Sequence, residues 1–384
     1  MRRIVGLIFV AGLVAAGWFA WALYSPMAPS TQTFVLLHPG YSTRRIAAEL
    51  KGAGIIRSEE AFVLWHYVHR HRSLKAGEYL FDKPANLVDV QRRLIHGDVY
   101  LRTVIVPEGF TMFDIAHAVE AAGLGPAQDF LKEAQSDTTL IADIAPNAQS
   151  LEGYLFPETY EFTRLMTMHD MAAAMVKQFR QVARQVGLIP ASASMSPIGL
   201  SRASVHQGNA RQINARQSNA RQINADLRTQ TTASGQPVGG ETANAVSSDV
   251  QTTIIMASIV EKETAAPEER PLVASVYYNR LLKKIALDAD PSIIYAELLA
   301  GTYTGALHHA DMQFQSPYNT YRNAGLPPGP IGNPGRSSIE AAMHPAESDY
   351  FYFVADAAGH HRFAKTMEEH NKNVNAYRKA MRAK

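Results

Sequence analysis

The chain has 384 residues, enough for one large domain or two to three modest ones. Its formal net charge is +2, from 37 basic and 35 acidic residues, which argues against a protein dominated by nucleic-acid binding. It contains no cysteine, so disulfides, thiolate catalysis and thiolate metal ligands are excluded.

The N-terminal residues 1–30 have the composition of a membrane anchor. Arg2 and Arg3 precede an apolar run from Ile4 to about Tyr24, and about 20 such residues span a bilayer as a helix. The arginines favour a cytoplasmic N-terminus on a single-pass inner-membrane anchor, with the bulk of the chain in the periplasm, facing the cell wall. A cleaved signal peptide is the alternative, but the bulky segment Trp18–Trp21 does not suit a cleavage site.

Residues 32–100 are expected to form a small α+β module. A strand at Thr33–Leu37 is followed by two helical segments with predicted N-caps at Ser42–Thr43 and Ser58. A second strand is predicted at Leu74–Phe81, before a final helix. This strand–helix–helix–strand order resembles the LysM-type folds that bind peptidoglycan sugars, although many small α+β modules share it.

The remainder, residues 101–384, is predicted to be a mixed α/β domain, which makes the whole chain α+β. It begins with a strand at Leu101–Val106 and a helix capped by Thr111. The aromatic and acidic stretch Leu151–Phe162 is either packed in the core or forms a wall that stacks on sugar rings, and core packing is the commoner role of such residues.

A low-complexity segment at residues 192–250 interrupts this domain. It repeats Asn-Ala-Arg-Gln every five residues and is polar and poor in aromatics, so it is expected to be a disordered insertion. A basic arm built on Arg211, Arg216 and Arg221 is the less favoured alternative. Deletion of residues 200–245 is expected to leave the activity of the domain intact.

Two glutamates lie in the predicted helix "TTIIMASIVEKET", at Glu261 and Glu263. Residues two apart on a helix project about 200° apart, so these carboxyls are not expected to share one glycosidic bond, as the paired carboxylates of most glycosidases do. Glu263 has the more apolar neighbours, which would raise its pKa and keep it protonated as a general acid. Glu261 is better suited to a hydrogen bond or a salt bridge.

Polar groups further along the chain are candidates for substrate binding. Asp290 precedes an apolar helix and is a candidate N-cap. The proline-stiffened segment 316–335 holds further phenol and amide groups, at Tyr318, Asn319, Tyr321 and Asn333. A connection packed only for stability is an equal alternative for this segment.

Other chemistries lack their motifs. The chain has no His-Glu-x-x-His zinc motif, no Gly-x-Ser-x-Gly elbow and no phosphate-binding loop. The paired histidines His308–His309 and His360–His361 lack ligand spacing to a third partner and are expected to be exposed. No metal and no cofactor are therefore predicted.

Several motifs together resemble one known family. They are "ASIVEKET", "NRL" at Asn279–Leu281, "DADPSIIY", "SPYNTYRNAGLPPGPIGNPG", "AAMHPA" and "YFYFVAD…HRFAKTMEEHNKNV". In this order they are similar to the bacterial endolytic peptidoglycan transglycosylases, the YceG-like family. The resemblance is close over residues 251–380 and looser over residues 32–190.

The resemblance implies a lytic transglycosylase that cuts nascent glycan strands within their length, between N-acetylmuramic acid and N-acetylglucosamine. It leaves a 1,6-anhydro-muramoyl end and ends strand elongation. The family's catalytic glutamate falls on Glu263, and the motifs suggest the substrate-binding residues Glu261, Asn279, Asp290, Tyr318, Asn319, Tyr321 and Asn333. Peptidoglycan synthases (penicillin-binding proteins) are the implied partners, and nucleic acid is not.

Two other functions remain open at this point. One is a non-catalytic, wall-binding scaffold that recruits synthases through residues 32–100. The other is a hydrolytic, lysozyme-like muramidase. Mass spectrometry of digested glycan distinguishes them, because the three functions give anhydro ends, no cleavage and reducing ends, respectively.

Overall fold

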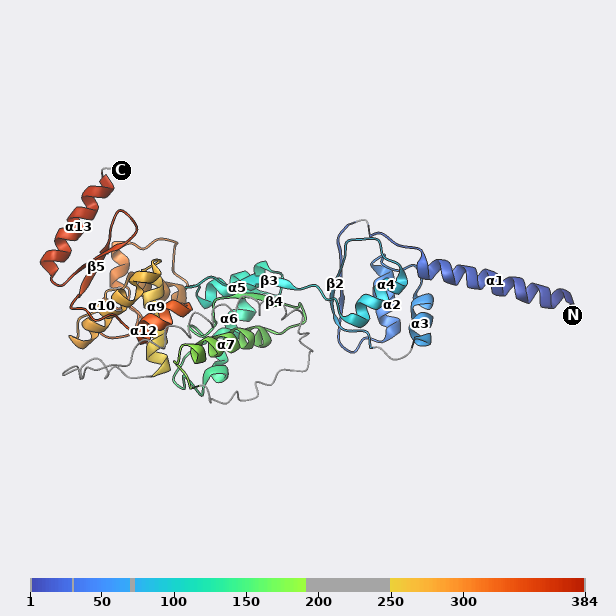
Figure 1. Cartoon of the computed structure of the whole chain (residues 1–384), viewed down its shortest axis with the longest axis horizontal. Coiled ribbons are helices and arrows are strands. Elements are labelled where there is room, and N and C mark those ends of the chain that lie inside the picture. The colour runs from blue at the N-terminus through green and yellow to red at the C-terminus, as the bar shows by residue number, and fades with distance from the viewer. Residues whose placement is uncertain (1, 30, 70–72, 191–248, 383–384) are drawn as a thin grey trace, which may run out of the picture.

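The computed structural model describes residues 2–29, 31–69, 73–190 and 249–382. Nearly all of the predicted insertion at residues 192–250 lies outside these ranges. In Figure 1 the described chain is drawn out along one axis, with a long helix at one end, a small subdomain next to it and a larger helix-rich part at the other end. The observed class is α+β, as predicted.

The first helix, α1 (Arg2–Tyr24), projects from the small subdomain (Figure 1). The strands β1 (Thr33–Leu37) and β2 (Gly77–Phe81) pair antiparallel, with Val35 opposite Tyr79. Three helices pack with this pair: α2 (Thr43–Gly52), α3 (Glu59–Val68) and α4 (Leu87–His96). The predicted order of elements is therefore present, and the likeness to LysM-type folds stays a prediction.

Local capping chemistry sets the ends of these helices. The hydroxyl of Ser42 accepts a hydrogen bond from the backbone N–H of Arg45, and that of Ser58 accepts one from Ala61. These bonds satisfy N–H groups that a helix leaves without a partner, so both predicted caps are confirmed. Gly97 ends α4 in the left-handed conformation, at φ +78°.

The larger part begins with a segment that runs to residue 190. Its elements are β3 (Arg102–Ile105), α5 (Met112–Ala121), α6 (Ala127–Ser136), η1 (Thr138–Ile141), β4 (Thr159–Phe162) and α7 (Met168–Gln185). Thr111 caps α5 as predicted, in a reciprocal pair with Asp114. The aromatic rings of residues 151–162 are buried in the core, so the alternative of a sugar-stacking wall is wrong.

The C-terminal half of the larger part carries the motif helices. Its elements are α9 (Val250–Glu263), η2 (Pro267–Glu269), α10 (Arg270–Leu282), α11 (Asp290–Ala300), η3 (His309–Gln313), α12 (Arg336–Met343), β5 (Tyr352–Ala355), β6 (His361–Ala364) and α13 (Met367–Arg382). One continuous core joins both halves, and α9 packs closely on α12. A separate core fills the small subdomain.

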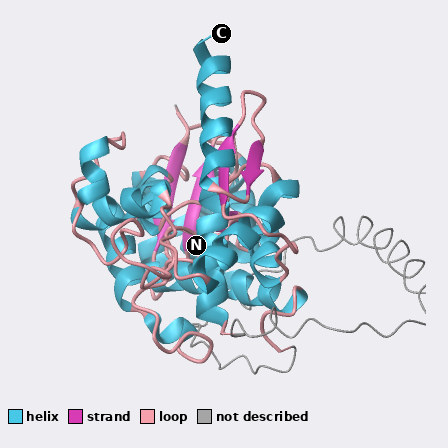
Figure 2. Ribbon diagram, turned by 90° about the vertical axis from the view of Figure 1, so that its left-hand side faces the viewer, coloured by secondary structure: helices cyan, strands magenta, loops and turns pink. Residues whose placement is uncertain are grey.

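Within the described residues the strands form three separate two-stranded antiparallel sheets. Figure 2 shows these short strands among helices, with α13 projecting from the body. The larger part therefore mixes helices and strands as predicted, but its strands form small separate pairs. Only β5 and β6 form a hairpin, whereas helices separate the partners in the other two sheets, and helix packing builds most of the core.

Candidate active site

Glu263 is the last residue of α9, where the backbone turns extended at Thr264. Its half-buried carboxyl is hydrogen-bonded to the phenol of Tyr277, which lies on α10 and is 2% exposed. Burial raises the pKa of Glu263 to about 7, with a further rise from the charge of Asp290 that the bond to Tyr277 opposes. Near neutral pH this carboxyl therefore holds or releases a proton with little cost, which suits a general acid and base.

Asp290 and Tyr321 form a second polar pair near Glu263. The Tyr321 hydroxyl donates a hydrogen bond of 2.6 Å to Oδ1 of Asp290. Both side chains are exposed, Tyr321 at 37%. Asp290 does not cap α11, because the N-cap is Ala289 and Asp290 is itself the first residue of the helix, so the predicted cap is wrong. The carboxylate of Asp290 is directed to Tyr321 instead.

Glu261 lies in a different environment from Glu263. Its carboxyl is 5% exposed and accepts a 2.8 Å hydrogen bond from the guanidinium of Arg270 and a 2.9 Å bond from the backbone N–H of Gly335. Arg270 also approaches Glu108 and bonds to Ser337. The pair therefore ties the end of α9 to the starts of α10 and α12, which is a hydrogen-bonding and salt-bridge environment.

The sequence profile of the YceG-like family matches residues 35–376. The chain belongs to the YceG-like family. This match confirms the family predicted from the motifs, and the relatives described next also confirm the predicted class of enzyme, a lytic transglycosylase.

The YceG-like chain is 30% identical over 384 residues to a protein of Bacillus subtilis (strain 168) named endolytic murein transglycosylase, covering 95% of this chain and 91% of that one. It is 26% identical to a protein of the same name from Streptococcus pneumoniae serotype 2 (strain D39), with 96% of this chain and 63% of that one covered. The 2.6 Å crystal structure of a YceG-like protein from Listeria monocytogenes is 28% identical, covers 89% of this chain and 98% of that one, and has a TM-score of 0.48.

Two further amides that the motifs suggested for substrate binding are engaged inside the YceG-like chain. Asn279 donates to the carbonyls of Ser348 and Tyr350, at 2.8 and 3.0 Å, and so holds the segment before β5. Asn319 is fully buried and donates to two carbonyls of its own loop. Both amides hold backbone carbonyls in place, and their contact with substrate stays a prediction.

Asn333 is also fully buried, and all of its side-chain bonding capacity is used. Its Oδ1 accepts hydrogen bonds from the backbone N–H groups of Gly153 and Leu155, at 2.8 and 2.9 Å. Its Nδ2 donates to the carbonyl of Phe110 and to Oε1 of Glu152. Asn333 therefore joins three segments that are far apart in sequence, and its contact with substrate stays a prediction.

Glu152 is a buried carboxyl that the sequence reasoning did not single out. Both oxygens accept from the backbone N–H of Met112, at the start of α5, and the carboxyl is also hydrogen-bonded to Tyr295. Burial raises the pKa of Glu152 to about 8. Tyr318 packs on Tyr295 with ring centroids 5.1 Å apart, and burial raises its pKa to about 12.

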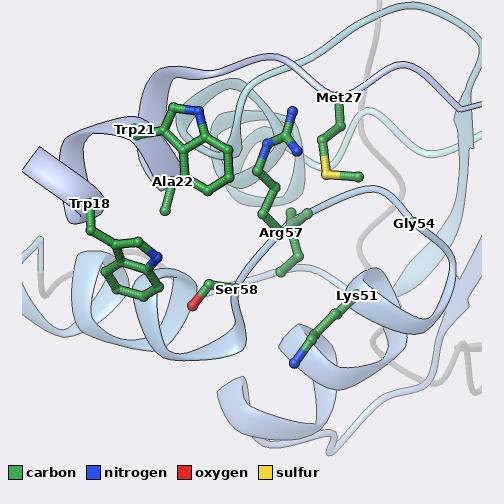
Figure 3. A pocket seen from close by; sticks show the side chains of 9 residues that line it. Trp18, Trp21, Ala22, Met27, Lys51, Gly54, Arg57 and Ser58 are labelled. Atoms are coloured by element: carbon green, nitrogen blue, oxygen red, sulfur yellow. The ribbon is translucent and has the colours of Figure 1, made fainter.

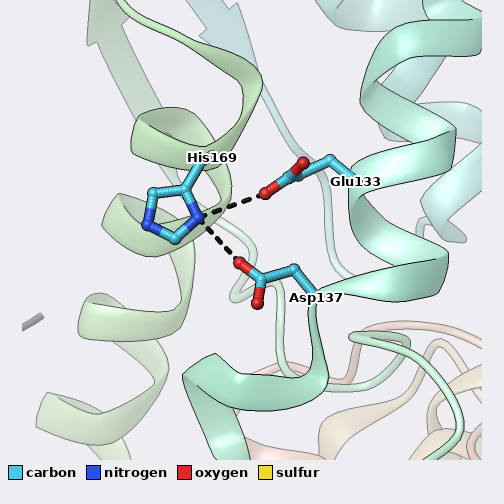
Figure 4. Close-up of side chains that lie close together, drawn as sticks. All are labelled: Glu133, Asp137 and His169. Atoms are coloured by element: carbon cyan, nitrogen blue, oxygen red, sulfur yellow. Dashed lines mark hydrogen bonds and ion pairs between the residues drawn. The ribbon is translucent and has the colours of Figure 1, made fainter. Parts of the chain in front are cut away.

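A cluster of possible metal ligands lies away from these residues. Glu133 and Asp137, at the end of α6, both face Nδ1 of His169 on α7, at 3.1 and 2.7 Å (Figure 4). Although burial opposes it, the bonds to the two carboxyls raise the pKa of His169. Because both carboxylates bond to the same imidazole nitrogen, the three side chains form an ion pair between α6 and α7. That the chain binds no metal stays a prediction.

The histidine pairs differ from their expected exposure at one position. His308, His309 and His360 are exposed, as expected. His361 is not, because it begins β6 and its Nδ1 lies 2.6 Å from Oε2 of Glu269. This ion pair joins the C-terminal hairpin to the start of α10.

Proposed function

We propose that this YceG-like chain is an endolytic lytic transglycosylase that cleaves peptidoglycan between N-acetylmuramic acid and N-acetylglucosamine within nascent strands. The observation that carries the proposal is the half-buried carboxyl of Glu263, whose pKa is raised to about 7 beside the exposed pair of Asp290 and Tyr321. One carboxyl with that pKa supplies both proton transfers of the reaction.

The reaction needs no water. Glu263 donates its proton to the glycosidic oxygen as the bond from that oxygen to C1 of the muramoyl residue breaks. The C6 hydroxyl of the same sugar then attacks C1, and the Glu263 carboxylate takes the hydroxyl proton. The products are a 1,6-anhydro-muramoyl end and a free strand, and Glu263 is protonated again.

Asp290 is assigned an electrostatic role in this reaction. Cleavage of a glycosidic bond develops positive charge at C1, and a carboxylate close to that charge stabilises it. Its hydrogen bond from Tyr321 holds the Asp290 side chain at the exposed end of α11. Among the candidate residues of the proline-stiffened segment 316–335, Tyr321 is the most exposed and is therefore the one best placed to contact the glycan.

Hydrolysis is the second candidate function, and Asp290 is the observation that favours it. A second carboxylate near the general acid is the arrangement of retaining muramidases, in which it acts as nucleophile before water attacks. Purified glycan strands digested with the wild type and with Glu263→Gln test both functions by mass spectrometry. If the wild type produces anhydro ends and the variant does not, the transglycosylase is supported. If the wild type produces reducing ends, the reaction is hydrolysis.

We also propose that α1 anchors the protein in the bacterial inner membrane, with Arg2 and Arg3 in the cytoplasm and the bulk of the chain facing the wall. Within the described residues α1 is the one helix long and apolar enough to cross a membrane, with a mean hydropathy of 2.2. A signal sequence would pass the same test. Residues 32–100 are proposed to bind glycan, and peptidoglycan synthases to be the partners.

A further inference from the structure

The end of α1 is part of the core of the small subdomain. Ala22 and Leu23 are each 2% exposed and belong to that core, and Phe19 packs against it. Just beyond the helix, Met27 and Ala85 exchange backbone hydrogen bonds of 2.9 and 3.0 Å. The subdomain is therefore fixed to its own anchor and is not joined to it by a flexible linker.

This attachment shortens the part of α1 that is left for the bilayer. The helical segment from Ile4 to Trp18 is exposed and spans about 22 Å at a rise of about 1.5 Å per residue. The hydrocarbon core of a bilayer is about 30 Å thick. If the segment spans, about 8 Å of the hydrocarbon layer must be bridged by thinning of the membrane or by the subdomain entering its surface.

The surface of the subdomain beside α1 has the chemistry of a membrane interface. An open pocket of about 440 Å³ lies between α1 and the α2–α3 connection. Trp18, Trp21 and Arg57 are among the residues that line it (Figure 3). The Arg57 guanidinium lies 4.8 Å from the centroid of the Trp21 ring, and Lys51 lines the same pocket. Tryptophan at the boundary and a cation near the phosphates are typical of membrane–water interfaces.

Helix α3 adds an apolar face at the same end of the subdomain. It contacts α1 and runs across the direction of that helix (Figure 1), with Trp65 6.5 Å from Tyr24 between ring centroids. On its outer face Leu64 is 49% exposed and Val68 66% exposed, although both are aliphatic. Exposed apolar residues on an amphipathic helix that lies flat beside a membrane span are suited to the headgroup–acyl boundary.

We propose that the outer face of α3, with the pocket of Trp18, Trp21 and Arg57, is a second membrane contact that seats the small subdomain in the outer surface of the phospholipid bilayer. Leu64 and Val68 enter the upper acyl layer, and Arg57 faces a headgroup phosphate. This contact covers the length that α1 lacks. The inference rests on the proposed anchoring by α1, and it is independent of the chemistry of Glu263.

The absence of cysteine makes the test direct, because any single cysteine introduced into the full-length chain is its only thiol. The variants Leu64→Cys and Val68→Cys carry an environment-sensitive fluorophore on α3. Leu101→Cys is the matched control, because Leu101 is 41% exposed and lies directly before β3. Strand β3 lies on the far side of the subdomain from α1 (Figure 1). Leu13→Cys, within α1, reports whether the anchor is inserted.

Each labelled protein is reconstituted in vesicles of phosphatidylethanolamine and phosphatidylglycerol, with spin-labelled lipids that quench at shallow or deep positions. We expect the shallow quencher to reduce the emission of labels at Leu64 and Val68, and the deep quencher to reduce that of the label at Leu13. Neither quencher should affect the label at Leu101. Quenching at Leu13 without quenching at Leu64 and Val68 would overturn the proposal while the anchor stands.

Two other results would also overturn the proposal. If lipid does not quench the label at Leu13, both the proposed anchoring by α1 and the proposed second membrane contact are wrong. A label at Leu64 with blue-shifted emission that lipid does not quench would mean that protein covers the face, and disulfide-linked dimers of unlabelled Leu64→Cys would identify that protein as a second copy. Circular dichroism of the exposed-site variants checks that the fold is kept.

Discussion

The phenol of Tyr277 is hydrogen-bonded to the carboxyl of Glu263, so two residues 14 positions apart meet at the end of one helix and in the middle of the next. The bond favours the ionised carboxyl, whereas burial and the charge of Asp290 favour the protonated one. The pKa of about 7 is the balance of these effects, and each of the two neighbours can be removed by an isosteric substitution.

The first prediction concerns the pH dependence of cleavage. Because Glu263 must be protonated to begin the reaction, the rate should fall as the pH rises through about 7. Asp290→Asn removes a charge that raises the pKa, so it should move this fall to lower pH. Tyr277→Phe removes a hydrogen bond that lowers the pKa of Glu263, so this variant should move the fall in rate to higher pH. Initial rates of anhydro-end formation from pH 5 to pH 9 measure the shift in each variant. If both variants shifted the pH profile in the same direction, the pKa would not belong to Glu263 in this environment.

The second prediction separates the two glutamates of the motif. Glu263→Gln should abolish product with little effect on folding, because the amide carries no transferable proton. Glu261→Gln should retain some cleavage and lower the stability, because removing one partner of a buried ion pair costs about 3–5 kcal/mol. Product analysis and the midpoint of thermal unfolding are measured on both variants. If both variants lost activity equally and kept the stability of the wild type, the catalytic role of Glu263 and the structural role of Glu261 would be wrongly assigned.

Local chemistry explains what the sequence could predict. The caps at Ser42, Ser58 and Thr111 depend on bonds that reach only three residues along the chain, so their residue types suffice to find them. The separation of Glu261 and Glu263 follows from helix geometry in the same way. The apolar length of α1 is likewise a property of consecutive residues.

Contacts over long sequence separations explain what was missed. Glu152 and Asn333 are 181 residues apart, and no spacing rule links an acidic residue in an apolar stretch to an amide near the C-terminus. The one available signal was a carboxyl between Leu151 and Gly153 with no basic neighbour, which is costly to bury unless it is hydrogen-bonded. Asp290 was misplaced as a cap because its bond to Tyr321 comes from a loop 31 residues away.

The third prediction tests the structural role of Asn333. Asn333→Ala leaves the buried N–H groups of Gly153 and Leu155 without an acceptor, and each such group costs about 1–3 kcal/mol. We expect a clear drop in the unfolding midpoint and an unchanged KM for the folded fraction. Asn147→Ala, at an exposed position, is the control. A raised KM with unchanged stability would instead identify Asn333 as a substrate-binding residue.

The fourth prediction concerns the cluster of Glu133, Asp137 and His169. Because the pKa of His169 is raised above its unfolded value, the ion pair stabilises the fold at low pH and loses its effect as the pH rises through the folded pKa. His169→Gln should remove this part of the pH dependence of unfolding. Treatment with a chelator, or addition of Zn²⁺, should leave the midpoint and the activity of the wild type unchanged. A midpoint that falls with the chelator would identify the cluster as a metal site.

The last prediction concerns the buried carboxyl of Glu152. Its pKa is about 8 in the folded protein against 4.5 as the ordinary value, so between these limits the folded state binds the extra proton. Stability should therefore fall as the pH rises from about 4.5 to about 8. Glu152→Gln, which is neutral at every pH and keeps an acceptor for Met112, should be less sensitive to pH than the wild type over this range.

Because Glu263 contributes a fall of the same sign, the decisive quantity is the difference in unfolding midpoint between the wild type and Glu152→Gln at each pH. That difference should grow in favour of the variant from about pH 5 to about pH 8. Glu158→Gln, at an exposed position in the same stretch, is the matched control and should follow the wild type throughout. A difference that stays constant with pH would mean that Glu152 is ionised in the folded protein, held as a carboxylate by the N–H of Met112 and the amide of Asn333.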